Sequence, residues 1–149
     1  MVSIIVGSKS DLPIMEETTK KLKELGIACE MKIMSAHRHP ETVRRFAKSA
    51  EKRKIEVIIA GASGAAALPG VIASYTTIPV IGVPIKSELD GLDSLLSIAQ
   101  MPKGVPVATM AIGKAGAINA AIFTAEILAL KYSKIKKNLF NYKKSLNVR

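Results

Sequence analysis

The chain has 149 residues, enough for one ordinary domain, and its apolar fraction of 48% and charged fraction of 23% are typical of globular proteins. This composition excludes disordered, collagen-like and low-complexity classes, and no apolar stretch has the roughly 18 residues that a membrane-spanning helix needs. The net charge is +10, but with three Tyr, three Phe and no Trp the chain has few rings on which single-stranded nucleic acid could stack.

Near the start of the chain, residues 4–6 form an apolar run that predicts a strand ending at Gly7. They show neither a basic segment nor a small-residue cleavage pattern, so we interpret them as part of the fold and not as a secretory signal. The single cysteine, Cys29, cannot form an internal disulfide, zinc-ligand spacings are absent, and a buried apolar role is expected for it. A reducing, cytoplasmic location is therefore expected.

Short apolar runs alternate with segments of helical periodicity along the rest of the chain. A first helix is expected after residue 11, with Pro13 in its first turn and Gly26 as its stop. Further strands are predicted at residues 31–34, 57–60, 80–83 and 107–110, and further helices from Pro40 to about 50, at 65–74, at 91–100, at 115–130 and, as a basic helix, at about 133–149.

Strands that are this short and continuously apolar, each followed by a helix, are typical of a parallel sheet with both faces covered. We therefore predict one α/β domain over residues 1–149, a doubly wound three-layer α/β/α sandwich of the flavodoxin or Rossmann kind. Residues 131–149 carry seven of the 22 basic side chains and no acidic one. This pattern favours a solvated helical face, with nucleic acid or an anionic surface as the alternative partner.

In open parallel sheets, ligands bind outside the carboxyl ends of the strands. The segments after the first three predicted strands are rich in glycine, serine and polar side chains. They read GSKSD at residues 7–11, SAHRHP at 35–40 and GASGAAALPG at 61–70. We expect these three loops to lie along one edge of the sheet and to carry the chemistry.

The first loop joins a strand to the start of a helix, where free backbone N–H groups and the helix dipole attract phosphate. It matches neither the phosphate-binding loop of nucleoside triphosphatases nor the glycine triplet of dinucleotide sites. A simpler interpretation is that Ser10 or Asp11 caps the helix. The two roles are compatible, because a capping residue leaves its neighbours free to bind a ligand.

Both histidines of the chain lie in the second loop. The imidazole of His37 can give and take a proton near neutral pH, and the guanidinium of Arg38 offers a planar fork for phosphate or carboxylate. An exposed surface pair is the alternative. His39, beside Pro40, is interpreted as a helix-entry residue, and a metal site is not expected because no third ligand is evident. The small residues of the third loop allow either close approach of a flat ligand or tight helix–sheet packing.

Four segments in order, residues 7–11, 35–40, 68–70 (LPG) and 100–106 (QMPKGVP), resemble class I 5-(carboxyamino)imidazole ribonucleotide mutases of de novo purine synthesis. The likeness extends from residue 4 to about residue 130. It implies an isomerase that interconverts 5-(carboxyamino)imidazole ribonucleotide and 4-carboxy-5-aminoimidazole ribonucleotide without metal, nucleotide or redox cofactor. It also implies an octamer whose C-terminal helix packs on a neighbouring subunit, and a functional link to an ATP-dependent synthetase that makes the carbamate.

The resemblance also implies roles for individual residues. Ser8, Ser10 and Arg38 would hold the substrate phosphate with Ser35 nearby, and Asp11 would accept hydrogen bonds from the ribose hydroxyls. The backbone around Ala62, Ser63 and Gly64 would line the pocket for the base and its carboxylate. His37 would be the general acid and base.

Three residues depart from the family pattern: Ser63 stands where a glycine is usual, Ala67 where a histidine is usual, and His39 where a threonine is usual. The loss of an imidazole at position 67 leaves two alternatives open. One is a direct carboxylase that adds free carbon dioxide to aminoimidazole ribonucleotide, as in the related class II enzymes. The other is a weakened homologue that binds the nucleotide without converting it. A flavodoxin-like electron carrier is disfavoured, since no aromatic residue lies in these loops.

Overall fold

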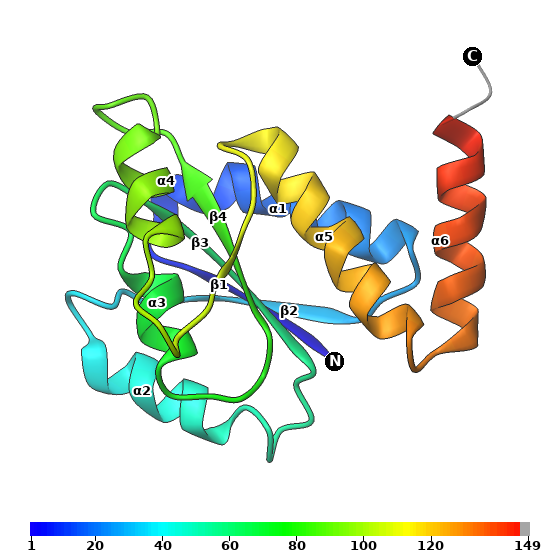
Figure 1. The fold of residues 1–149 in the computed structure, drawn as a ribbon, viewed down its shortest axis with the longest axis horizontal. Helices are drawn as coiled ribbons and strands as arrows, with labels where there is room; N and C mark the ends of the chain where they lie inside the picture. Colours follow the sequence, from blue (N-terminus) through cyan, green and yellow to red (C-terminus); the bar gives the residue numbers. More distant parts are fainter. Residues whose placement is uncertain (147–149) are drawn as a thin grey trace.

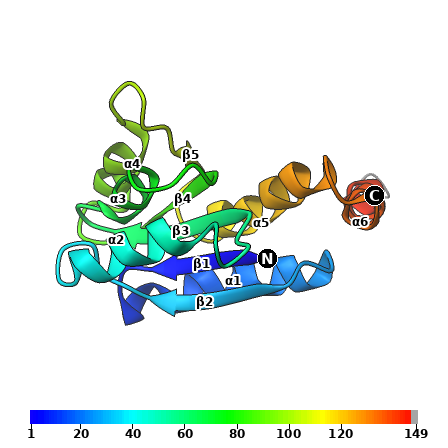
Figure 2. The ribbon, with the colours of Figure 1, turned by 90° about the horizontal axis from the view of Figure 1, so that it is seen from below.

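The computed structural model describes residues 1–146 and contains a five-stranded, all-parallel sheet. The strand order is β2-β1-β3-β4-β5, and the strands follow one another in this order from bottom to top in Figure 2. The bounds are β1 Val2–Val6, β2 Cys29–Ile33, β3 Val57–Ser63, β4 Val80–Ile85 and β5 Ala108–Thr109. The predicted strands are all present, and the α/β class is confirmed.

The helices alternate with the strands as predicted. They are α1 Leu12–Glu24, preceded by the short 3-10 helix η1 Lys9–Asp11, and then α2 Pro40–Ser49, α3 Leu68–Ala73, α4 Leu92–Ala99, α5 Lys114–Ala129 and α6 Ser133–Leu146. Gly26 follows α1 with a φ of 75°, a left-handed conformation in which a residue without Cβ ends a helix at little cost. The last three residues of the predicted basic helix, 147–149, lie outside the described part of the chain.

Two buried apolar clusters lie on opposite faces of the sheet. One joins the strands to α1 and α5, with Met15 and Leu22 fully buried. The other joins the strands to α2, α3 and α4, with Phe46, Ile72 and Ile98 among its members. Figure 1 shows α1 and α5 on one side of the sheet and α2 and α3 on the other. The three-layer sandwich is therefore confirmed.

The strand ends differ from the sequence prediction at the carboxyl edge of the sheet. β3 and β4 each continue past the predicted apolar run, because Ala62 pairs with Pro84 and Ser63 with Ile85. Residues 61–63, expected in a loop, are therefore the last residues of β3. Cys29, expected to be buried, is only partly buried, since it lies on the edge strand β2.

Helix α6 packs beside α5, at the end of the molecule away from the carboxyl ends of the strands (Figure 1). Leu139 enters the apolar cluster, and the Asn138 side chain donates a hydrogen bond to the Leu25 carbonyl at 3.0 Å. Phe140 and Leu146 remain 68% and 57% exposed. Across residues 1–146, no helix is both long and apolar enough to cross a membrane.

Candidate functional site

The loops after β1, β2 and β3 meet at the carboxyl edge of the sheet and enclose a cavity of about 360 Å³. This volume lies within the range of small-molecule sites. The lining residues come from all three predicted loops: Gly7, Ser8, Asp11, Ser35, Ala36, His37, Arg38, Ala62, Ser63, Ala66, Ala67 and Leu68. The convergence expected from strand order is therefore present, and His37 lines the cavity.

The first loop is held by its own serines. The Ser8 hydroxyl accepts hydrogen bonds from the Ser10 backbone N–H at 3.4 Å and from the Ser10 hydroxyl at 3.0 Å, which caps η1. Asp11 lies at the N-cap position of α1 but makes no capping hydrogen bond. The capping prediction for Ser10 or Asp11 was therefore wrong: Ser8 caps the short helix that precedes α1.

Asp11 is the most deeply buried of the polar residues around the cavity, with 3% of its surface exposed. Burial raises the pKa of its carboxyl above the usual value, and the neighbouring Ser63 and Ser10 hydroxyl groups act in the opposite direction. A buried acceptor that opens into a polar cavity is suited to receive hydroxyl donors from a ligand.

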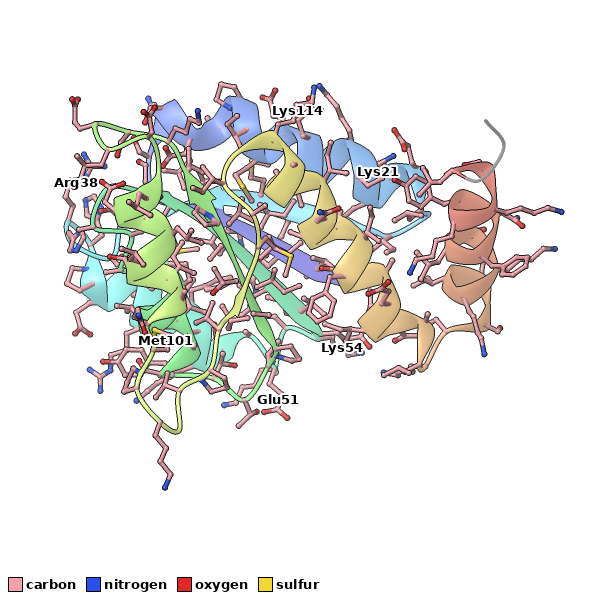
Figure 3. All side chains as sticks on the ribbon, turned by 45° about the horizontal axis from the view of Figure 1, so that its top comes forward. Lys21, Arg38, Glu51, Lys54, Met101 and Lys114 are labelled. Carbon is pink, nitrogen blue, oxygen red and sulfur yellow. The ribbon has the colours of Figure 1, made fainter. Side chains whose placement is uncertain are left out.

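The second loop is tied both to itself and to the first loop. The Ser35 hydroxyl accepts the Arg38 N–H at 3.2 Å, and the Ser35 carbonyl accepts the His39 N–H at 2.9 Å. The Arg38 guanidinium donates to the Gly7 carbonyl at 3.5 Å. Figure 3 shows Arg38 on the side of the molecule away from α6. His37 and Arg38 are both exposed, so a ligand can reach them from solvent.

His39 occupies the N-cap position of α2, where its side chain is exposed and makes no capping hydrogen bond. This agrees with its interpretation as a helix-entry residue. It is not among the residues that line the cavity. Ala67, in contrast, lines the cavity directly.

The third loop turns sharply after β3. Gly64 has a φ of 60° and Ala66 a φ of 37°, and the turn leads into α3 at Leu68. Ala62, Ser63 and Ala66 line the cavity, whereas Gly64 does not. The backbone N–H of Gly64 instead donates a hydrogen bond to the Ser87 hydroxyl at 3.1 Å.

A second hollow, of about 390 Å³, shares Asp11 and Ser63 with the first cavity. It brings in the loop after β4, and its lining is Ser10, Asp11, Ile14, Ser63, Ile85, Lys86, Ser87 and Gly113. Ser10 lines this hollow and not the cavity of His37. Sequence reasoning missed Lys86 and Ser87, although they follow a predicted strand as the other three loops do.

The sequence model of the AIR carboxylase family matches residues 1–148. The chain belongs to this family. It is 58% identical over 146 residues to the N5-carboxyaminoimidazole ribonucleotide mutase of Pyrococcus abyssi, which covers 97% of this chain and 83% of that protein. It is 53% identical over 144 residues to the mutase of Pseudomonas aeruginosa, covering 96% and 88%.

A crystal structure of Treponema denticola PurE superposes on the chain with a TM-score of 0.87 at 29% sequence identity, covering 97% of this chain and 89% of that one. The family inferred from the four sequence segments is thus confirmed by both sequence and structure.

Proposed function

We propose that this member of the AIR carboxylase family is an N5-carboxyaminoimidazole ribonucleotide mutase of purine biosynthesis, acting as a single domain over residues 1–149. The mutase names of relatives at 53–60% identity support this activity. The observation that carries the proposal is the position of His37, which lines a cavity formed by the three loops that share the family's motifs.

The cavity offers each part of the substrate a chemically suitable surface. The exposed Arg38 guanidinium and the Ser8 hydroxyl would bind the phosphate at the start of η1. Ser35 would hold the Arg38 backbone, and Ser10 would hold Ser8 through the hydrogen bond between their hydroxyl groups. The buried carboxylate of Asp11 would accept the ribose hydroxyls. The end of β3, at Ala62 and Ser63, would bound the imidazole and its carboxylate, and Gly64, which does not line the cavity, would shape the turn behind them.

In the proposed reaction, proton transfer is the chemical step that a side chain must perform. His37 donates a proton to the carbamate nitrogen as the nitrogen–carbon bond breaks, which releases carbon dioxide and leaves the electron-rich aminoimidazole. A ring carbon then attacks the trapped carbon dioxide, and His37 removes the proton from that tetrahedral carbon to restore aromaticity. The histidine ends as it began, so the remaining work is to keep carbon dioxide beside the ring.

The purified protein should interconvert the two ribonucleotides without ATP, and His37→Asn should abolish turnover without changing the fold. Wild-type rates in that variant would contradict the proposed role of His37. With substrate labelled at its own carboxyl carbon, a mutase keeps the label, whereas a direct carboxylase incorporates carbon from bicarbonate. Binding without conversion would identify a weakened nucleotide-binding homologue.

We also propose an octameric assembly in the cytoplasm, in which the exposed apolar side chains of α6 pack on a neighbouring subunit. Phe140 and Leu146, on the part of the helix not covered by α5, support this arrangement. Deletion of residues 133–149 should then lower the number of subunits in the assembly, as measured by light scattering. The labile carbamate would come from an ATP-dependent synthetase.

A further inference from the structure

The loop that follows β4 lies beside the site but has no role in the function proposed above. Within it, the Ser87 hydroxyl accepts a hydrogen bond from the Gly64 backbone N–H at 3.1 Å and donates one to the Asp93 carboxylate oxygen Oδ2 at 3.4 Å. Ser87 therefore connects the turn of the third loop, 23 residues earlier in the chain, to the first turn of α4.

The α4 end of this connection is firmly anchored. The other oxygen of Asp93 accepts the Ser94 backbone N–H at 2.9 Å. The Ser94 hydroxyl is fully buried and lies 2.9 Å from both the Ile85 carbonyl, at the end of β4, and the Gly91 carbonyl. Ser94 is thus bonded to the sheet and to the start of α4. Because Asp93 is bonded to Ser94, its carboxylate is held in place and gives Ser87 a fixed hydrogen-bond partner.

The other end of the connection holds a turn with an unfavourable backbone conformation. Gly64 and Ala66 both have positive φ angles, and for Ala66 a left-handed conformation is less favourable than the right-handed one because its Cβ approaches the following carbonyl oxygen. Such a conformation persists when surrounding contacts fix it. Ala66 and Ala67, the residues that this turn carries, line the same cavity as His37.

We propose that Ser87 is a positioning residue of the mutase: by holding the Gly64 N–H, it keeps the 63–67 turn closed over the His37 cavity while carbon dioxide is free. The proposal rests on the proposed function, since only a reaction with a released intermediate depends on such closure. It also assigns the Gly64 N–H to the protein's own structure, so that this group does not bind the substrate carboxylate.

The test measures retention of the substrate's carboxyl carbon. Ser87→Ala removes the hydroxyl from an exposed loop position without opening a core cavity. By the usual strength of one hydrogen bond, the fraction of turnovers that lose labelled carbon to solvent should rise about two- to tenfold. Ser87→Thr keeps the hydroxyl and should restore retention, and Asp93→Ala should raise the loss without altering Ser87 itself.

Ser49→Ala is the matched control, because within residues 1–146 the Ser49 hydroxyl bonds only to the Phe46 carbonyl of its own helix α2. It should leave retention unchanged, and hydrogen exchange at the Gly64 amide should accelerate in Ser87→Ala but not in Ser49→Ala. Unchanged retention in Ser87→Ala, with a wild type that keeps its label, would overturn the role of Ser87 alone. A wild type that takes its carboxyl carbon from bicarbonate would overturn the mutase and with it the retention role.

Discussion

Two neighbouring threonines of α1 should respond in opposite directions to the same substitution. The fully buried Thr18 donates a hydrogen bond from its hydroxyl to the Ala117 carbonyl of α5 at 2.8 Å. Within residues 1–146, the buried Thr19 hydroxyl has no hydrogen-bond partner. Valine replaces a hydroxyl by a methyl group of similar shape, and the helix propensities of the two residues are close.

Thr18→Val should lower the free energy of unfolding by about 1–2 kcal/mol, because the α1–α5 bond is lost while the Ala117 carbonyl keeps its helical partner. Thr19→Val should leave it unchanged or raise it by up to about 1 kcal/mol, since an unpaired polar group is removed. Urea unfolding at one fixed protein concentration measures both. A Thr18→Val variant as stable as Thr19→Val would refute the reasoning.

Four further predictions concern substrate binding, titrating groups and backbone packing. Asp11→Asn should raise KM about ten- to a hundredfold, since hydrogen bonds to a charged group are the stronger kind; steady-state kinetics checks this. Because burial raises the pKa of Asp11, its ionisation opposes folding as pH rises, so Asp11→Asn should have the higher Tm at pH 7 and lose this advantage in acid. The Lys131 and Tyr132 side chains hold the pKa of Glu56 at about 2, so Glu56→Gln should lower Tm at pH 7 by an amount that disappears as pH falls from about 4.5 towards 2. Gly116→Ala should prevent folding, because its Cβ would lie 1.6 Å from the Ala111 carbonyl oxygen, whereas a Cβ at Gly7 meets nothing closer than 3.9 Å and Gly7→Ala should express as a folded protein.

The apolar runs predicted the sheet well, because a strand buried on both faces leaves a continuous apolar signature. The carboxyl ends of β3 and β4 could not be predicted in this way. Gly61, Ser63 and Pro84 are weak strand formers, and they are extended here because the neighbouring strand pairs with them. At the far edge, β5 pairs over two residues only, and the apolar run at 107–110 overstates its length.

The site followed from strand order, but its details depend on contacts between segments far apart in the chain. Nothing in the sequence indicates that Ala66 adopts a positive φ or that Ser87 reaches Gly64 across 23 residues. Similarly, Ser8, Ser10 and Asp11 are all common capping residues, and only the presence of η1 decides that Ser8 is the one that caps.

The placement of His39 bears on how the proposed reaction proceeds without the imidazole that the family usually has at position 67. His39 lies at the start of α2, outside the residues that line the cavity, so it does not replace that group. The third loop lines the same cavity as His37 with side chains that, apart from Ser63, are small or apolar, among them Ala62, Ala66 and Leu68. In the proposed mechanism, both proton transfers would therefore fall to His37, and a largely apolar wall would favour uncharged carbon dioxide over bicarbonate. Retention of carbon dioxide would then depend on how tightly the 63–67 turn closes, so the proposed anchor at Ser87 would set how much carboxyl carbon is lost during turnover.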